Sequence, residues 1–198
     1  MTKCAGYKRK LPRQTTAEER IGLQLFWIFV CYSFLGFCLE VLFAWATGGR
    51  RDRKCMVVLP LCPVYGLGAV LILYLAPLAG GNLLLLFGIG AAASTVVEYG
   101  MALWYEKILG VSFWDYSALK GNLQGKVCIP FSLAWGILAL GLVRWVHPGI
   151  LPVIAEIPVG ITLSMLVLVV TDALVAAVML RRTGDRDCLR WYRFGRAG

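Results

Sequence analysis

Five long apolar segments constrain the fold of this chain more than any other feature. They are separated by short stretches that hold most of the charged residues. An apolar run of about 20 residues is long enough to cross the hydrocarbon core of a bilayer as a helix. The five segments cover residues 21–46, 57–79, 83–105, 129–146 and 159–180. The sequence therefore predicts an all-α, polytopic transmembrane helix bundle with five spans.

Composition indicates one membrane domain between two basic tails. The chain has 198 residues, of which 59% are hydrophobic and 16% are charged. A soluble domain of this size does not hold so much apolar sequence in such long runs. The first run is too long for a cleaved signal peptide and contains Glu40, so we expect a retained helix. We expect tails over residues 1–20 and 181–198 and a single transmembrane domain over 21–180.

The net charge of +9 comes mainly from the tails and from the turn at 50–54. Basic residues that flank membrane spans contact anionic lipid head groups and set the orientation of the protein. We therefore expect the lipid bilayer as a partner, and no nucleic acid. With five spans, the positive-inside rule places the C-terminal tail in the cytoplasm, although the basic N-terminal tail opposes this orientation. A re-entrant loop over 108–128, which makes six crossings, would remove the conflict.

Two stretches share one pattern of residues at the start of an apolar run. In each, a proline is followed at the same spacing by a cysteine or serine, an aromatic residue and a glycine. Because proline interrupts a helix and unpaired backbone is costly in lipid, each entry must be buried in protein or line a wet cavity. The pattern predicts a weak parallel repeat of two spans, although two unrelated helix starts with similar chemistry would look alike. The first copy holds Pro60, Cys62, Tyr65 and Gly66, with Pro63 and Gly68 beside them, and the second holds Cys128, Pro130, Ser132, Trp135 and Gly136.

Glu40, Glu98 and Asp172 are the ionisable residues deepest within the apolar runs. A charge in this position costs a few kcal/mol, so each side chain is expected to face the interior of the bundle. One interpretation is a binding point for a cation, a proton or a polar substrate. The other is an internal staple held by hydrogen bonds from aromatic side chains. The aromatic candidates are Tyr32, Tyr65, Tyr99 and Trp135, and Gly36 lies on the same helix face as Tyr32 and Glu40.

The long loop before the fourth run mixes aromatic, acidic, amide and basic side chains. These residues are Trp114, Asp115, Tyr116, Asn122 and Lys126. The loop is suited to gripping a polar ligand at the membrane surface. The alternative is an aromatic belt at the interface, in which Asp115 caps a turn or pairs with Lys126.

Enzymatic motifs are absent from the sequence. Cys62 beside Pro63 is a candidate nucleophile, but a reactive thiolate needs a nearby base or cation, and the single histidine lies far along the chain. The seven cysteines are scattered without a C-x-x-C pair. We therefore expect no catalytic residue, no metal site and no cofactor. A Walker A motif is also missing, so the chain does not hydrolyse ATP by itself.

Several motifs taken together resemble a known family. They are Tyr32-Ser33-Phe34-Leu35-Gly36 with Glu40, the proline motif at 60–68, Glu98-Tyr99, and Trp114-Asp115-Tyr116-Ser117 with Asn122, Gly125, Cys128, Ser132 and Trp135-Gly136. Over about residues 25–150 the chain resembles the small bacterial membrane proteins described as ABC-transporter permeases of type IV (CmpB-like). Lys126 stands where that family often has Arg, and Phe37 where it often has Trp. The resemblance implies a permease of the bacterial inner membrane, but it assigns no substrate and no residue roles.

We therefore expect an integral membrane transport protein that acts as a permease or permease subunit. It would need a nucleotide-binding ATPase subunit or an ion gradient, and a homo-oligomer is compatible with the same sequence. In this interpretation the three acids line the interior of the bundle. The loop from Trp114 to Lys126 either gates the transport pathway or binds the ligand. The alternative is a binding or scaffold subunit that does not transport by itself. A membrane enzyme acting on lipid would need paired acidic motifs, whereas the acids here are dispersed.

Overall fold

The computed structural model of this protein describes residues 17–48 and 56–190. The predicted N-terminal tail lies outside these residues except at 17–20, as do the basic turn at 50–54 and the last part of the C-terminal tail. The helices are α1 (Ala17–Ala46), α2 (Pro63–Leu75), η1 (Ala76–Ala79), α3 (Leu83–Trp104), η2 (Tyr105–Leu109), α4 (Ile129–Gly141), η3 (Leu142–Val146), α5 (His147–Ala155), α6 (Val159–Thr183) and η4 (Arg186–Leu189). Two short strands, β1 (Asn122–Leu123) and β2 (Val127–Cys128), form an antiparallel pair. The predicted all-α polytopic bundle is confirmed.

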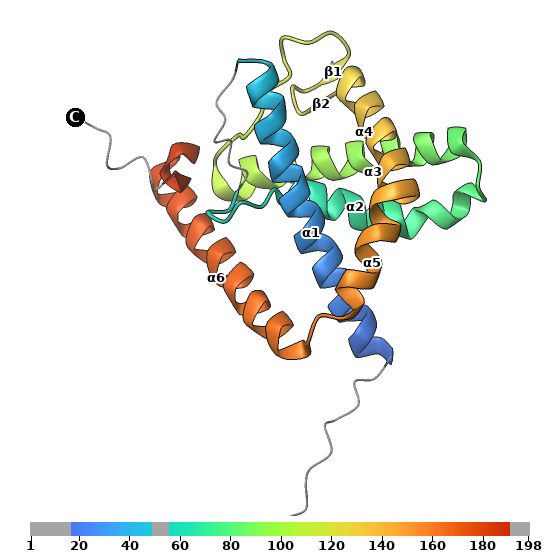
Figure 1. Ribbon diagram of the computed structural model, residues 1–198. Coiled ribbons are helices and arrows are strands. Elements are labelled where there is room, and N and C mark those ends of the chain that lie inside the picture. Colours follow the sequence, from blue (N-terminus) through green and yellow to red (C-terminus); the bar gives the residue numbers. More distant parts are fainter. Residues whose placement is uncertain (1–16, 49–55, 191–198) are drawn as a thin grey trace, which may run out of the picture.

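Four helical segments within the described residues are long and apolar enough to cross a membrane. They are Ile21–Ala46, Leu83–Leu109, Ile129–Ala155 and Val159–Thr183. The fifth predicted span is a shorter apolar helix, Pro63–Ala79, preceded by the non-helical segment 56–62. Figure 1 shows that α1 and α6 run in the same direction, so the start of α1 and the end of α6 lie at opposite ends of the molecule.

The second predicted span begins later than expected because of Pro63. Cys62 is the extended N-cap of α2, and Pro63 occupies the first helical position. A helix that began at Leu59 would place Pro63 in its second turn, where it lacks the N–H that bonds the carbonyl four residues earlier. In the second copy Leu133 stands at the matching place, and α4 accordingly begins at Ile129. Pro60 therefore lies before the start of α2, whereas Pro130 lies in the first turn of α4, so the two motif prolines differ in structure although their sequence spacing is shared.

The fourth predicted span continues well past its expected end. The predicted span ends at residue 146, just before His147-Pro148-Gly149, but α5 follows directly and runs to Ala155. The π turn η3 explains the continuation: the N–H of His147 donates to the carbonyl of Leu142, five residues earlier. A wider turn of this kind accommodates a proline that would otherwise clash with the helix. A second π turn, η2, ends the third span at Gly110, whose φ is +71°.

Two helix pairs form the centre of the molecule, because α1 packs mainly on α2 and α3 mainly on α4. Gly66 of α2 approaches Phe29 of α1, and Gly136 of α4 approaches Phe87 of α3. Phe29 and Phe87 stand at the same distance before Glu40 and Glu98, respectively. The second helices of the two pairs therefore approach matching positions of the first helices. These contacts agree with a parallel repeat in which α1–α2 corresponds to α3–α4.

Candidate functional site

Glu98 of α3 lies inside the bundle and is 5% exposed. The Trp135 indole Nε1 of α4 donates a hydrogen bond to its Oε2 at 3.1 Å. The Tyr116 hydroxyl, from the long loop, donates to its Oε1 at 2.9 Å. Among the described residues, no lysine, arginine or histidine forms an ion pair with Glu98. Its two oxygens are thus satisfied by neutral donors from two different elements.

Glu40 of α1 lies beside this group. The Tyr65 hydroxyl of α2 donates to its Oε1 at 2.8 Å. The rings of Tyr65 and Trp135 contact one another, with centroids 4.7 Å apart and planes tilted by 52°. Glu40 and Glu98 are thus linked through the contact between their hydrogen-bond donors, Tyr65 and Trp135. We call Glu40, Tyr65, Glu98, Tyr116 and Trp135 the carboxylate centre.

The repeated motif builds this centre from matching positions. In each helix pair, the acid of the first helix accepts a hydrogen bond from the motif aromatic of the second helix. Gly36 allows the first of these contacts, because a Cβ at residue 36 would collide with the ring of Tyr65. Tyr65 and Trp135, the aromatic residues of the two motif copies, then contact each other where the α1–α2 pair meets the α3–α4 pair. Four separated parts of the sequence, one in each of the helices α1 to α4, are thus brought together by one duplicated arrangement.

The loop over 110–128 holds Tyr116 in place. Tyr116 N–H donates to the carbonyl of Gly125 at 2.7 Å, and its ring stacks on Phe131 with centroids 4.8 Å apart. Gly125 has a φ of +69°, and a Cβ there would meet Asp115 and Ser117. Burial, followed by the negative charge of Glu98, raises the pKa of Tyr116 well above its ordinary range. The phenol therefore remains a neutral donor at physiological pH.

The other predicted loop residues stabilise the loop itself. Asp115 accepts hydrogen bonds from the backbone and hydroxyl of Ser117, whose hydroxyl bond is the main cause of the lowered pKa of this exposed carboxyl group. Asn122 donates to the carbonyl of Leu119 at 2.7 Å and accepts from the N–H of Gly125 at 3.0 Å.

Trp114 and Lys126 join the loop to its surroundings. The Trp114 indole donates to the carbonyl of Lys126 at 2.8 Å, and Lys126 Nζ pairs with Glu106 Oε2 at 2.8 Å. Of the five predicted loop residues, only Tyr116 donates to the carboxylate centre. The expected alternative in which Asp115 caps a turn agrees with this geometry, whereas the ion pair of Lys126 is with Glu106.

Asp172 lies apart from the carboxylate centre. Its carboxylate, on α6, accepts hydrogen bonds from the backbone N–H groups of Val58 at 3.2 Å and Leu59 at 3.0 Å. These donors belong to the non-helical entry that Pro63 imposes on α2. In the second copy, the matching N–H of Ile129 bonds the carbonyl of Gly121 instead. Asp172 therefore accepts hydrogen bonds from the backbone before α2, in the place where the carbonyl of Gly121 in the hairpin loop accepts one from the start of α4.

The remaining predicted residues support helix contacts. Tyr32 is nearly buried, and its hydroxyl lies 3.3 Å from Nδ1 of His147. Cys62 and Cys128 are buried at the starts of α2 and α4. Ser132 accepts a hydrogen bond from the Thr95 hydroxyl at 2.7 Å. Neither the pairing of His147 with Tyr32 nor the stacking of Phe131 on Tyr116 was expected, since only the bends of the chain bring these residues together.

A cavity of about 470 Å³ adjoins the carboxylate centre. Its wall includes the Tyr65 and Trp135 rings, with Tyr32 also contributing to the lining. Most of the other lining residues are apolar and come from α1, α2, α4 and η3. The same two aromatic side chains thus line the cavity and donate to the carboxylates.

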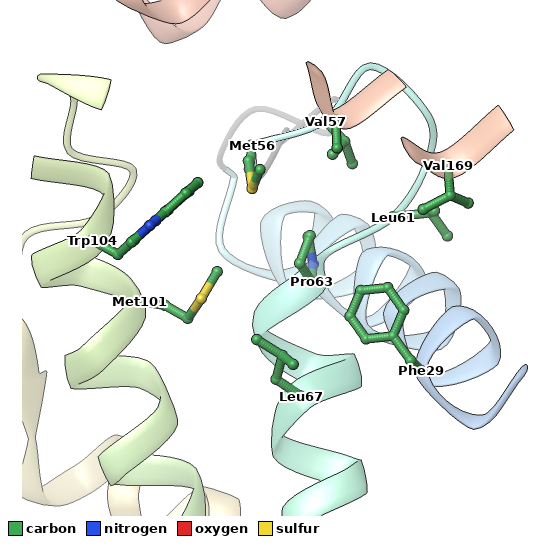
Figure 2. Close-up of a pocket in the computed structure, with 10 residues that line it drawn as sticks. Phe29, Met56, Val57, Leu61, Pro63, Leu67, Met101, Trp104 and Val169 are labelled. Atoms are coloured by element: carbon green, nitrogen blue, oxygen red, sulfur yellow. The ribbon is translucent and has the colours of Figure 1, made fainter. Parts of the chain in front are cut away.

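A second cavity, of about 310 Å³, lies between α1, the entry to α2, α3 and α6. Figure 2 shows Met101 and Trp104 on one side of it and Pro63, Leu67 and Phe29 on the other. Every lining side chain is apolar, so this cavity offers no hydrogen-bonding group apart from the indole N–H of Trp104. It separates α6 from α3 near the segment that Asp172 holds.

A family model places this arrangement among known proteins. The model described as "Putative ABC-transporter type IV" matches residues 27–180. The chain belongs to this family. The match includes Glu40, Glu98 and Asp172 together with both copies of the motif. Searches of curated proteins and of solved structures returned no match. With four helices among the described residues that are long and apolar enough to cross a membrane, this member of a transporter family is a multi-pass membrane protein.

Proposed function

We propose that this protein is the membrane-spanning permease subunit of a transporter, with the carboxylate centre at its functional site. The observation that carries the proposal is that Glu40 and Glu98 are joined through two aromatic donors, Tyr65 and Trp135, which contact each other and line a cavity. Carboxylates are costly at this depth, and in membrane proteins they commonly mark an ion or substrate pathway. Transporters built from repeats also place their sites where the repeats meet.

An ATPase partner supplies the energy in this proposal. The chain has no Walker A motif, whereas its family is described as an ABC transporter. We assign the protein to the bacterial inner membrane, with the end of α6 on the cytoplasmic side. Lys107, Arg181 and Arg182 are exposed at that end, where η2 packs against the last turns of α6, and they favour this orientation by the positive-inside rule. The loop over 110–128 then presents its outer surface to the ATPase subunit.

Affinity purification of the full chain from membranes of its source organism tests the partner. We expect a soluble subunit with a Walker A motif to co-purify at a fixed ratio, and ATP hydrolysis to accompany the complex. A matched preparation of an unrelated multi-pass membrane protein is the control. Repeated recovery of the chain without any nucleotide-binding subunit would contradict the permease-subunit assignment.

A scaffold subunit is the second candidate. It is favoured by the internal roles of Asp172, Asp115, Asn122 and Lys126, all of which bond to the protein itself. In a scaffold the carboxylate centre would be a closed staple, and Glu98 would be unreachable by any ligand. A lipid-modifying enzyme has less support, because Asp172 is separated from the other two acids and holds backbone.

A further inference from the structure

We propose that the 470 Å³ cavity binds an amphipathic cation, which is a molecule with an apolar body and one positively charged head. The head lies against the Tyr65–Trp135 ring pair, in the field of Glu98, and the body fills the apolar part of the cavity. The inference rests on the proposed function and names the substrate class of the same site.

The lining of the cavity indicates an apolar body. Its volume of about 470 Å³ falls within the range of small-molecule sites, roughly 300–1,000 Å³. Leucine, isoleucine, alanine and valine side chains of α1, α2, α4 and η3 form most of the wall. The π turn η3 contributes Leu142, Trp145 and Val146, and π turns recur at functional sites. A molecule with a large polar body would lose its hydration here without compensation.

The polar end of the cavity indicates a positive charge. Tyr65 and Trp135 present two aromatic rings to the cavity and direct their hydroxyl and N–H to Glu40 and Glu98 on the other side. A cation over such rings is attracted by their π-systems, and this attraction grows when water is excluded. Glu98 adds a carboxylate directly behind Trp135, and its hydrogen-bond donors, Tyr116 and Trp135, are both neutral. An anion at the same place would be repelled by both carboxylates.

The far end of the cavity carries a different polar group. Tyr32 lines it, with its hydroxyl near His147, while most of the other lining residues are apolar. A neutral phenol beside an imidazole does not oppose a positive charge placed at the Tyr65–Trp135 end. Charge complementarity therefore fixes the orientation of the bound molecule, with its head toward Glu98.

Two glycines provide a matched pair of variants. Gly141 lines the cavity, and a Cβ there would have only Trp145 within reach, at 3.9 Å. Gly141→Leu therefore fills cavity space without forcing a backbone contact. Gly100 is an exposed glycine of α3 with nothing within 4 Å of a Cβ. Gly100→Leu makes the same change in a membrane helix away from the cavity.

Tetraphenylphosphonium and tetraphenylborate are suitable probes, because they have nearly the same shape and opposite charges. Radiolabelled tetraphenylphosphonium is titrated against the full chain in lipid nanodiscs, with binding to empty nanodiscs subtracted. We expect saturable binding that tetraphenylborate does not compete for. Glu98→Gln and Gly141→Leu are each expected to weaken binding by roughly tenfold or more, and Gly100→Leu to leave it unchanged.

Three results would overturn the inference: no saturable binding to the wild-type chain, equal competition by tetraphenylborate, or wild-type affinity in Glu98→Gln. If Gly141→Leu does not give a monodisperse protein, Glu98→Gln alone decides the role of charge. Recovery of an ATPase subunit without cation binding would reject the substrate class and leave the permease role standing. Cation binding without such a subunit would reject the ATP-driven role alone.

Discussion

Replacing Asp172 with alanine is expected to detach the entry segment 56–62 from α6. The carboxylate accepts hydrogen bonds from the N–H groups of Val58 and Leu59, and this backbone cannot become helical because of Pro63. Hydrogen bonds to charged groups contribute about 1.5–3 kcal/mol each, so losing both should cost about 3 kcal/mol of unfolding free energy. Asp172→Asn keeps one acceptor oxygen and should lose about half as much.

Alkylation of Cys62 measures this release directly. Cys62 is the last residue of the segment and is fully buried, so its thiol should be unreactive in a variant that keeps it as the only cysteine. Adding Asp172→Ala should make Cys62 react with N-ethylmaleimide many times faster. Cys128, the buried N-cap of α4, is the matched control, because its entry is held by the hairpin loop rather than by Asp172. Equal protection of Cys62 with and without Asp172 would show that the carboxylate does not hold the segment.

Gly66→Ala is expected to have a comparably large effect on the packing of α1 against α2. A Cβ on Gly66 would lie 2.5 Å from the carbonyl oxygen of Phe29 and even closer to the Ser33 hydroxyl. Because the first of these atoms is helix backbone, the two helices must move apart. Overpacking of this kind costs about 1–3 kcal/mol, and we expect the upper end here together with disruption of the Tyr65–Glu40 contact.

Gly68→Ala is the control for this prediction. It lies two residues further along the same helix, where a Cβ would meet Ser94 at an ordinary 3.8 Å. Alanine is favoured over glycine in a helix by about 1 kcal/mol, so this variant should be neutral or more stable. Thermal unfolding of the two variants in one detergent compares them. Similar midpoints for Gly66→Ala and the wild-type chain would contradict the close approach of α1 and α2.

The helical class and the depth of the acids could be predicted from the sequence. A long apolar run folds into few structures other than a transmembrane helix, and an acid within such a run must face the protein interior rather than lipid. The exact ends of the helices could not be predicted in the same way. Pro63 and Pro148 have the same local chemistry, yet one starts a helix and the other is absorbed into a helix by a preceding π turn.

The three acids also show where sequence reasoning stops. Glu40 and Glu98 each precede one copy of the proline motif in the sequence, and the contacts of Tyr65 and Trp135 match that repeat. Asp172 looked the same in the sequence, but its partners are backbone groups of a segment more than one hundred residues earlier. The hydrogen-bond donors that an acid meets depend on how the helices pack, and the local sequence pattern does not determine that packing.

Labelling of carboxyl groups by dicyclohexylcarbodiimide tests most directly whether the carboxylate centre is a functional site. This apolar reagent forms a stable adduct with carboxyl groups that take up a proton within the membrane and can be reached there. The full chain is treated in native membranes, and mass spectrometry locates the adduct. We predict labelling of Glu98 or Glu40, reduced by tetraphenylphosphonium, and no labelling of Asp172. An unlabelled centre, or labelling of Asp172 alone, would contradict the account and favour a closed structural staple.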